Sequence, residues 1–304
     1  MLLDKRQLLN LLLFLESNSK NLVLVMKKML VIFLLISSIT IKGQTPDSLI
    51  GKWIPSLTTG IGISQIAFSN WVKGGESSIA WTLIGDFTLN REKKPWIIKN
   101  QIKAQYGRAK IGDGSYRTTA NDLYIESLAS YDLGWAVSPF LSNAIRTQVS
   151  TGFDYKTAGF PNISDFFDPG YITQSIGFTF DKYPSILTRF GIAFQEVITN
   201  KFTQYSDDPK TSEVEKFKFE TGIESVTDID FEVDVNVKWK SKVRFFSRFE
   251  SLDVWDVLWD NTVTGKINNW LSVKFTYILL YEKAQSIKAQ MKEGLQIGIT
   301  YTLI

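Results

Sequence analysis

Five basic residues share one face of the segment 232–250, and their spacing is the first sign of chemistry in this sequence. They stand at even positions, which lie on one side of an extended strand, while the odd positions are mostly apolar. Such a row could line an aqueous path and favour anions. It could instead form ion pairs with acids on facing strands, because a buried charge needs a partner. Pairing is the favoured interpretation for this row, which consists of Lys238, Lys240, Lys242, Arg244 and Arg248.

Enzyme chemistry has few starting points here. The chain contains no histidine and no cysteine, which excludes a Ser-His-Asp arrangement, a thiolate nucleophile and Cys-ligated zinc. A carboxylate pair such as Glu220 with Glu224 is conceivable, but carboxylates are common in polar interiors. Asp228, Asp230 and Asp234 lack the spacing and glycine of a calcium loop, so a solvated turn is predicted there. We predict no enzyme activity and no catalytic, cofactor or metal site.

The elements that position the charged row are predicted from a two-residue alternation. In "WIIKNQIKAQYG", residues 96–107, the even positions are mostly apolar and the odd positions mostly polar, which is the period of a β-strand. Twelve such segments follow one another with no convincing helix between them. Their predicted ranges are 57–69, 77–90, 96–111, 121–132, 140–153, 170–182, 186–199, 214–228, 232–250, 254–267, 271–283 and 292–304.

Two folds could use these strands: a soluble sandwich with its apolar faces in a core, or a transmembrane barrel with its apolar faces on lipid. Sandwich strands are typically about 5–6 residues long, and many of these alternations are about twice that length. Trp and Tyr residues often stand near the strand ends, as in the aromatic girdles of membrane barrels. A closed barrel also leaves no exposed strand edge. We predict an all-β fold: a single antiparallel up-and-down transmembrane β-barrel of about 12 strands over residues 44–304.

In such a barrel the charged faces must point inward, because a Lys or Arg on the lipid side costs about 2–4 kcal/mol at the bilayer midplane. Besides the row at 238–248, the bases expected in the lumen are Lys99, Lys103, Arg146, Arg189, Lys218, Lys266 and Lys274. The acids expected there are Asp86, Glu126, Asp132, Glu220, Glu224 and Asp260.

The predicted connectors differ in length between the two ends of the barrel. If the first strand runs outward, the inner connectors are mostly short, and one of them is expected around Asp228-Ile229-Asp230. The two longest connectors, 154–169 and 200–215, then lie outside. Short periplasmic turns and longer extracellular loops are typical of outer-membrane barrels.

The N-terminal residues are predicted to direct export. A short basic stretch at 26–28 and an apolar run at 29–41 form a signal peptide over 26–43, with residues 1–25 as an extension upstream of the true start. A signal anchor that uses both apolar runs is the alternative. Residues 1–43 hold six of the 34 basic and two of the 31 acidic residues, which leaves 28 basic against 29 acidic. This balance gives no reason to expect a nucleic-acid partner.

The segment "QIAFSNWVKGGESS", residues 65–78, resembles a motif of a Bacteroidota-type outer-membrane β-barrel family described as a domain of unknown function. The matching residues are Ser69, Asn70, Trp71, Gly74 and Gly75. "WDNTVTGKINNW", 259–270, is similar to a later segment of that family, and the likeness covers about Trp53 to Ile304. The resemblance implies an outer-membrane barrel with no established activity. One departure from outer-membrane barrels is the final Ile304, where many end in Phe or Trp.

We therefore expect a barrel in the outer membrane of a Gram-negative bacterium, acting as a channel or transporter for small solutes, with anions as one candidate class. The alternative is a non-conducting barrel with a filled lumen, serving the envelope structure or surface interactions. The expected partners are outer-membrane lipid, small solutes and the barrel-assembly machinery.

Overall fold

The computed structural model describes residues 51–67, 75–183, 185–208, 211–282 and 288–302. The predicted extension 1–25 and signal peptide 26–43 lie outside these residues, as do Ser69, Asn70, Trp71 and Gly74 of the family motif. Gly75 is described, and its φ of 116° is a conformation that favours glycine. Within the described part of the chain, no helix is long and apolar enough to cross a membrane.

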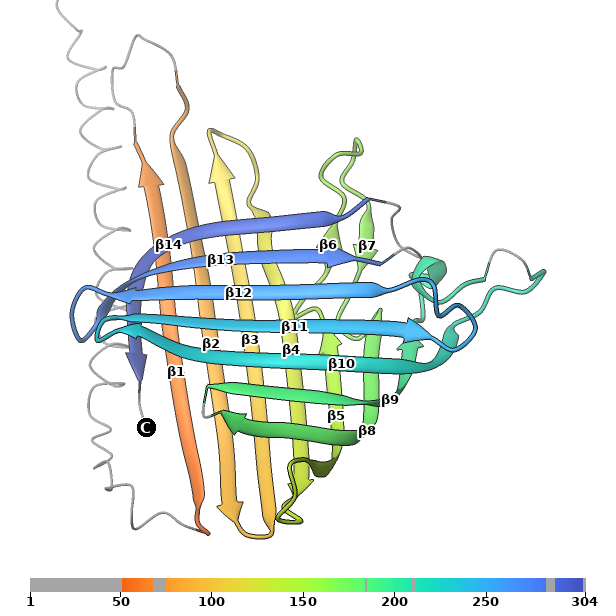
Figure 1. Cartoon of the computed structure of the whole chain (residues 1–304). Helices are drawn as coiled ribbons and strands as arrows, with labels where there is room; N and C mark the ends of the chain where they lie inside the picture. The colour runs from red at the N-terminus through yellow and green to blue at the C-terminus, as the bar shows by residue number, and fades with distance from the viewer. Residues whose placement is uncertain (1–50, 68–74, 184, 209–210, 283–287, 303–304) are drawn as a thin grey trace, which may run out of the picture. The chain divides into compact units, whose positions relative to one another are not determined.

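Twelve antiparallel strands form one closed barrel (Figure 1). β1 pairs with β14 through Thr58–Gly62 and Gly298–Thr302, which closes the sheet. A separate pair, β6 and β7, lies in the connection between β5 and β8. The elements are β1 Trp53–Ile66, β2 Ser78–Lys93, β3 Trp96–Ile111, β4 Arg117–Tyr131, β5 Ser138–Thr147, β6 Gly152–Phe153, β7 Asn162–Ser164, β8 Gly170–Tyr183, β9 Ile186–Ile198, the 3-10 helix η2 Thr203–Tyr205, β10 Phe217–Asp234, β11 Val237–Arg248, β12 Asp256–Lys266, β13 Leu271–Tyr281 and β14 Gln290–Thr302.

The predicted barrel and its strand number are confirmed, but one predicted turn is wrong. β10 continues to Asp234, so the turn is Val235–Asn236 and not the stretch around Asp228 and Asp230. The physical reason is cross-strand pairing: Asp228 lies opposite Lys242, and Asp230 lies opposite Lys240. Asp228 and Asp230 are therefore strand residues that complement the basic row, whereas Asp234 ends β10 and accepts a hydrogen bond from the Val235 N–H in the turn.

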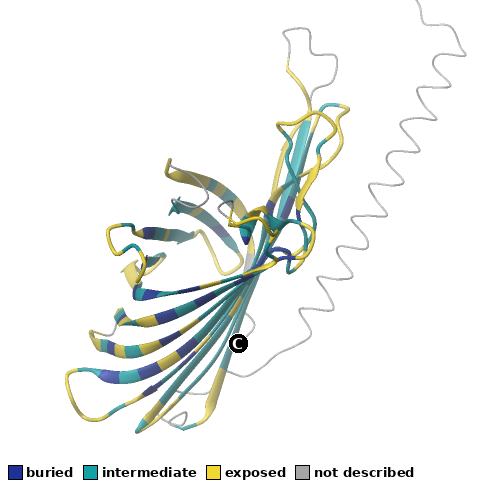
Figure 2. Ribbon diagram, turned by 90° about the vertical axis from the view of Figure 1, so that its right-hand side faces the viewer, coloured by how far each residue is buried: buried dark blue, intermediate teal, exposed yellow. Residues whose placement is uncertain are grey.

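Many large apolar side chains lie on the outside of the barrel. Leu83, Ile102, Ile176, Phe190 and Leu295 are all exposed, although they occupy the middle of long strands. Figure 2 shows buried and exposed residues alternating along single strands. Among the described residues, the sheet beside the barrel is the small β6–β7 pair, so no second sheet covers the apolar faces as it would in a sandwich.

Aromatic pairs mark two levels of this outer surface. Trp96 packs edge-on against Tyr131 at 5.0 Å between ring centroids, and Trp81 packs against Tyr106 at 5.8 Å. Trp96 and Tyr106 share one face of β3 and lie ten residues apart, about 33 Å along the strand. At a strand tilt of about 40°, this corresponds to about 25 Å along the barrel axis, which is the height of a lipid-facing band.

Candidate functional site

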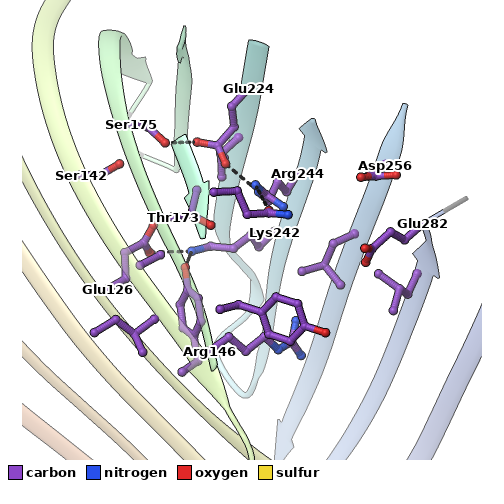
Figure 3. A pocket seen from close by; sticks show the side chains of 18 of the residues that line it. Glu126, Ser142, Arg146, Thr173, Ser175, Glu224, Lys242, Arg244, Asp256 and Glu282 are labelled. Atoms are coloured by element: carbon purple, nitrogen blue, oxygen red, sulfur yellow. Dashed lines mark hydrogen bonds and ion pairs between the residues drawn. The ribbon is translucent and has the colours of Figure 1, made fainter. Parts of the chain in front are cut away.

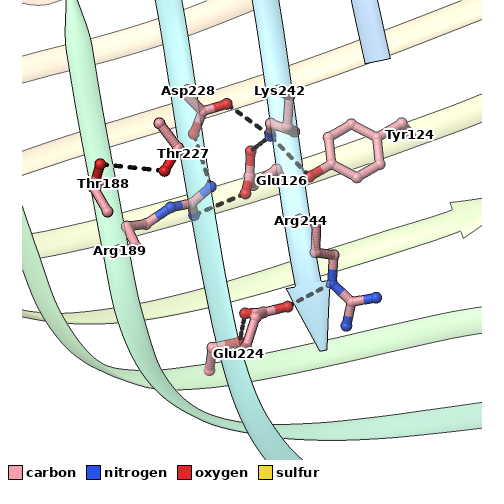
Figure 4. A network of polar contacts seen from close by, with 10 residues as sticks. Tyr124, Glu126, Thr188, Arg189, Glu224, Thr227, Asp228, Lys242 and Arg244 are labelled. Atoms are coloured by element: carbon pink, nitrogen blue, oxygen red, sulfur yellow. Dashed lines mark hydrogen bonds and ion pairs between the residues drawn. The ribbon is translucent and has the colours of Figure 1, made fainter. Parts of the chain in front are cut away.

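Side chains from opposite walls meet in the centre of the lumen (Figure 4). Lys242 on β11 donates from Nζ to Glu126 Oε2 on β4 at 2.6 Å and to the Tyr124 hydroxyl at 3.2 Å. At least four strands separate β4 from β11 in the barrel order. The contact therefore passes through the interior, and it places Lys242 and Glu126 on the lumen side of their strands.

Arg189 on β9 completes this group. Its guanidinium donates to Glu126 Oε1 at 2.8 Å and to Asp228 Oδ2 at 3.0 Å, while Lys242 lies 3.3 Å from Asp228 Oδ1. Both acids thus contact both cations. The Arg189 side chain is only 4% exposed, so its charge depends on these partners. We call Tyr124, Glu126, Arg189, Asp228 and Lys242 the lumen bridge.

A second charged group lies along β10 and β11 toward the end of the barrel that carries the long loops. Arg244 donates to Glu224 Oε1 at 2.6 Å and to Gln195 Oε1 at 3.1 Å. Arg248 donates to Glu220 at 2.6 Å and lies 2.9 Å from Asp256. These ion pairs and the hydrogen bond to Gln195 hold β9, β10, β11 and β12 together from the inside.

A phenylalanine fills the space between these two arginines. Phe246 is completely buried, and the guanidinium carbons of Arg244 and Arg248 lie 5.1 Å and 5.7 Å from its ring centroid. Such distances allow attraction between cation and ring. The loop half of the lumen is therefore packed on this wall rather than lined by free charges.

The opposite end of the lumen, beside the short turns, is more open. Lys238 pairs with Asp230 at 2.8 Å, and both side chains are at least 41% exposed. Lys99 and Lys103 on β3 have no ion pair within 4.0 Å among the described residues. Water can reach these groups, so this half of the lumen is a hydrated, partly cationic space.

A cavity of about 410 Å³ lies between the lumen bridge and the loops (Figure 3). Arg146, Lys242 and Arg244 line it from the side of β5 and β11. Leu258 on β12 and Ile278 and Leu280 on β13 supply apolar lining. A cavity of this volume with a few polar groups is typical of small-molecule sites.

The loops cover this cavity at the outer end. The Asp168 carboxylate accepts backbone N–H bonds from Asn200 and Lys201, both at 2.8 Å, and from Phe202 at 3.4 Å, which ties the two longest loops together. Burial favours the neutral acid, but these N–H donors outweigh burial and lower the pKa of Asp168. Tyr205, in the η2 turn of the second loop, lines the cavity.

The structure brings most of the predicted basic residues into contact with acids. Ion pairs within 4.0 Å hold Arg146, Arg189, Lys238, Lys240, Lys242, Arg244 and Arg248, but not Lys99 or Lys103. The sequence interpretation missed four of the acids that bind them, Asp122, Asp228, Asp230 and Asp256, and it also missed Phe246. Asp228 and Asp230 keep the even spacing of Glu220 and Glu224, so continuing that alternation would have placed them inward.

The closed barrel, its apolar exterior and its charged lumen together define an outer-membrane type of β-barrel. The model of the family "Protein of unknown function (DUF3078)" matches residues 63–153, a range that includes the predicted motif at 69–75. No curated protein matches the chain.

Several solved structures are similar to this chain at low sequence identity. The translocator domain of autotransporter NalP from Neisseria meningitidis is 7% identical, with 94% of this chain and 97% of that chain covered and a TM-score of 0.35. The COG4313 outer membrane channel from Pseudomonas putida F1 is 11% identical, with 86% and 99% covered and a TM-score of 0.35.

Proposed function

We propose that this protein is a channel for small solutes in the outer membrane, held closed by the lumen bridge in the conformation described here. The observation that carries the proposal is the contact between Lys242 and Glu126, which joins opposite walls of the barrel. This contact stands in the path of a solute that travels along the lumen between β4 and β11.

Space on both sides of the bridge supports a path rather than a solid plug. The cavity lies on the loop side, and the exposed side chains of Lys238, Lys240 and Asp230 lie on the turn side. Lys99 and Lys103 add positive charge to the turn side, since no acid lies within 4.0 Å of either in the described structure. This excess favours anions over cations in the hydrated half.

The orientation follows from the two ends of the barrel. Short turns at Lys94–Pro95 and 235–236 face the periplasm, and the long loops 148–169 and 199–216 face outward. The exposed aliphatic residues contact lipid between the two levels of aromatic pairs. Assembly by the barrel-assembly machinery follows from this location.

A non-conducting barrel is the second candidate function, and the equal numbers of cations and acids in the paired part of the lumen favour it. Within the lumen bridge and the neighbouring group, five cations face five acids: Arg189, Lys218, Lys242, Arg244 and Arg248 against Glu126, Glu220, Glu224, Asp228 and Asp256. Such matched pairs, together with buried Phe246, would also suit a permanently filled lumen that stabilises the barrel.

Conductance in a planar lipid bilayer separates the two candidates. The Glu126→Ala/Lys242→Ala double variant removes the cross-lumen contact while Arg189 keeps Asp228 as a partner. A channel predicts small or rare conductance for the wild type and larger, anion-preferring conductance for the double variant. The matched control is Lys94→Ala/Asp132→Ala, which removes a 2.9 Å ion pair at the turn end and should behave like the wild type.

Silence of the folded double variant at every voltage would contradict the channel and favour the filled barrel. Folding is checked by the different gel migration of heated and unheated samples.

A further inference from the structure

The cavity on the loop side of the lumen bridge has two chemically different walls. Arg146 on β5 faces it from one side, and Leu258, Ile278 and Leu280 on β12 and β13 line the other. At least four strands lie between β5 and β12 in the barrel order, so these walls are on opposite sides of the lumen.

One hydrogen bond orients the Arg146 side chain, but part of its guanidinium is still available to a ligand. Its Nε donates to Asp122 Oδ1 at 2.9 Å, and 37% of the side chain is exposed. Within the described residues, the two terminal amino groups of its guanidinium make no hydrogen bond. A guanidinium that is oriented through Nε still presents its amino edge to a carboxylate, which is a strong and directional contact.

The apolar wall is unusual for the inside of a membrane barrel, where interior positions are polar. Leu258 and Leu280 are opposite each other in the β12–β13 pairing, and Ile278 lies two residues away on the same face of β13. All three side chains are only partly buried. Covering them with an apolar molecule removes this surface from water, which is favourable.

Four acids line the cavity, Glu282 among them, and none of the four forms an ion pair with Arg146 in the described structure. Glu126 is bound by Lys242 and Arg189, Glu224 by Arg244, and Asp256 by Arg248. None of these three acids lies within 4.0 Å of the Arg146 guanidinium. The hydroxyl-bearing rings of Tyr171 and Tyr205 also line the cavity.

We infer that this cavity binds a small amphipathic organic anion, whose carboxylate contacts Arg146 and whose apolar body lies along Leu258, Ile278 and Leu280. The inference deepens the proposed function, since it names the class of solute, and it rests on the same barrel and lumen. Binding does not require conduction, however, so the two can fail separately. The volume of about 410 Å³ suits a medium-chain carboxylate.

Equilibrium dialysis of decanoate against the barrel in lipid nanodiscs tests this inference. The wild type should bind decanoate saturably above protein-free nanodiscs, with decanol a weak competitor and decylamine none. Arg146→Gln should weaken binding about tenfold or more, because it removes a charged hydrogen-bond donor. Ile278→Asn should weaken binding through the apolar wall. Arg91→Gln is the matched control and should bind as the wild type does, since Arg91 bonds the Gly51 carbonyl outside the cavity.

Equal binding by the wild type and folded Arg146→Gln and Ile278→Asn proteins would overturn the inference, as would wild-type binding no greater than that of empty nanodiscs. If Arg146→Gln does not fold, the other two measurements decide. Weaker binding by Ile278→Asn together with no competition by decylamine supports the inference, and the opposite results overturn it. Binding without conductance would support the inference and contradict the channel. Conductance without decanoate binding would support the channel and contradict the inference.

Discussion

Lys242 and Glu126 meet at 2.6 Å across the lumen, although at least four strands separate their positions in the barrel wall. Glu126 also binds Arg189 through its other carboxylate oxygen, so one acid holds two cations from two strands. This arrangement connects β4 to β9 and β11 inside the barrel. It makes Glu126 the residue on which the lumen bridge most depends.

Removal of the Glu126 charge should destabilise the barrel strongly. Glu126→Gln leaves Arg189 and Lys242 buried with Asp228 as their shared acid, and breaking a buried ion pair from one side costs about 3–5 kcal/mol. Urea unfolding followed by tryptophan fluorescence measures this loss. Asp132→Asn, which breaks the exposed pair with Lys94, is the control and should change stability little. Equal midpoints for the two variants would show that the bridge contributes nothing.

Phe246 should matter to stability far more than the phenylalanine beside it. Phe246→Ala opens a cavity between Arg244 and Arg248, and Phe→Ala at a buried site typically costs about 3–5 kcal/mol. Phe245 is the same residue type on the opposite face of β11, where it is exposed. Phe245→Ala should therefore cost less in the same unfolding measurement. The reverse order would mean that the two faces of β11 have been assigned wrongly.

The fold and the inward face of β11 could be predicted from the two-residue alternation of apolar and polar residues alone. The two-residue period placed Lys238, Lys242 and Arg244 on one face of the strand. That face was assigned to the lumen because a Lys or Arg side chain on the lipid side costs much free energy. It also predicted the closed barrel, since long alternating strands with apolar faces leave few other folds. Local patterning was sufficient wherever a residue needed to be assigned only to one side of a strand.

The partners of the charged row needed more than local patterning. The contact of Lys242 with Glu126 depends on which strands face each other across the lumen, and 116 residues separate the two in the sequence. The turn was misplaced at Asp228 because acids are common in turns, whereas here they pair with Lys240 and Lys242 across β10 and β11. The register of β10 against β11 decides which residues pair, and it cannot be read from the sequence of one strand alone.

The Asp168 carboxylate should control the order of the outer loops. Its pKa is lower in the folded protein than the ordinary value of 3.8, so its contribution is present above that value and is lost as the pH falls through the folded pKa. Asp168→Asn should mimic the loss at neutral pH. Hydrogen exchange measures it: the amides of Asn200 and Lys201, which bond this carboxylate, should lose protection, while those of β9 should not. Unchanged protection would mean that the Asp168 carboxylate is not needed to order the outer loops.

Glu282 should make the cavity sensitive to pH. Burial, followed by the nearby Asp256 carboxylate, raises the pKa of Glu282 to about 7, and Arg248, Glu220 and Lys218 also act on it. The folded state binds this proton more tightly than the unfolded chain, so stability falls as the pH rises from about 4.5 to about 7.

The same titration changes the charge of the cavity, because Glu282 also lines it. Decanoate should bind more tightly at about pH 6 than at about pH 8. Glu282→Gln should reduce this difference, and an unchanged difference would assign the pH dependence to another group.

The division between a lipid face and a lumen face is most directly tested by spin labels on β2. The chain has no cysteine, so single cysteines can be introduced at Leu83 and Phe87 on one face and at Thr82 and Thr88 on the other. Electron paramagnetic resonance then compares collisions with oxygen, which concentrates in lipid, and with a water-soluble nickel complex. Labels at 83 and 87 should respond mainly to oxygen, and labels at 82 and 88 mainly to nickel. The same response at all four positions, or the opposite alternation, would contradict a barrel with its apolar face on lipid.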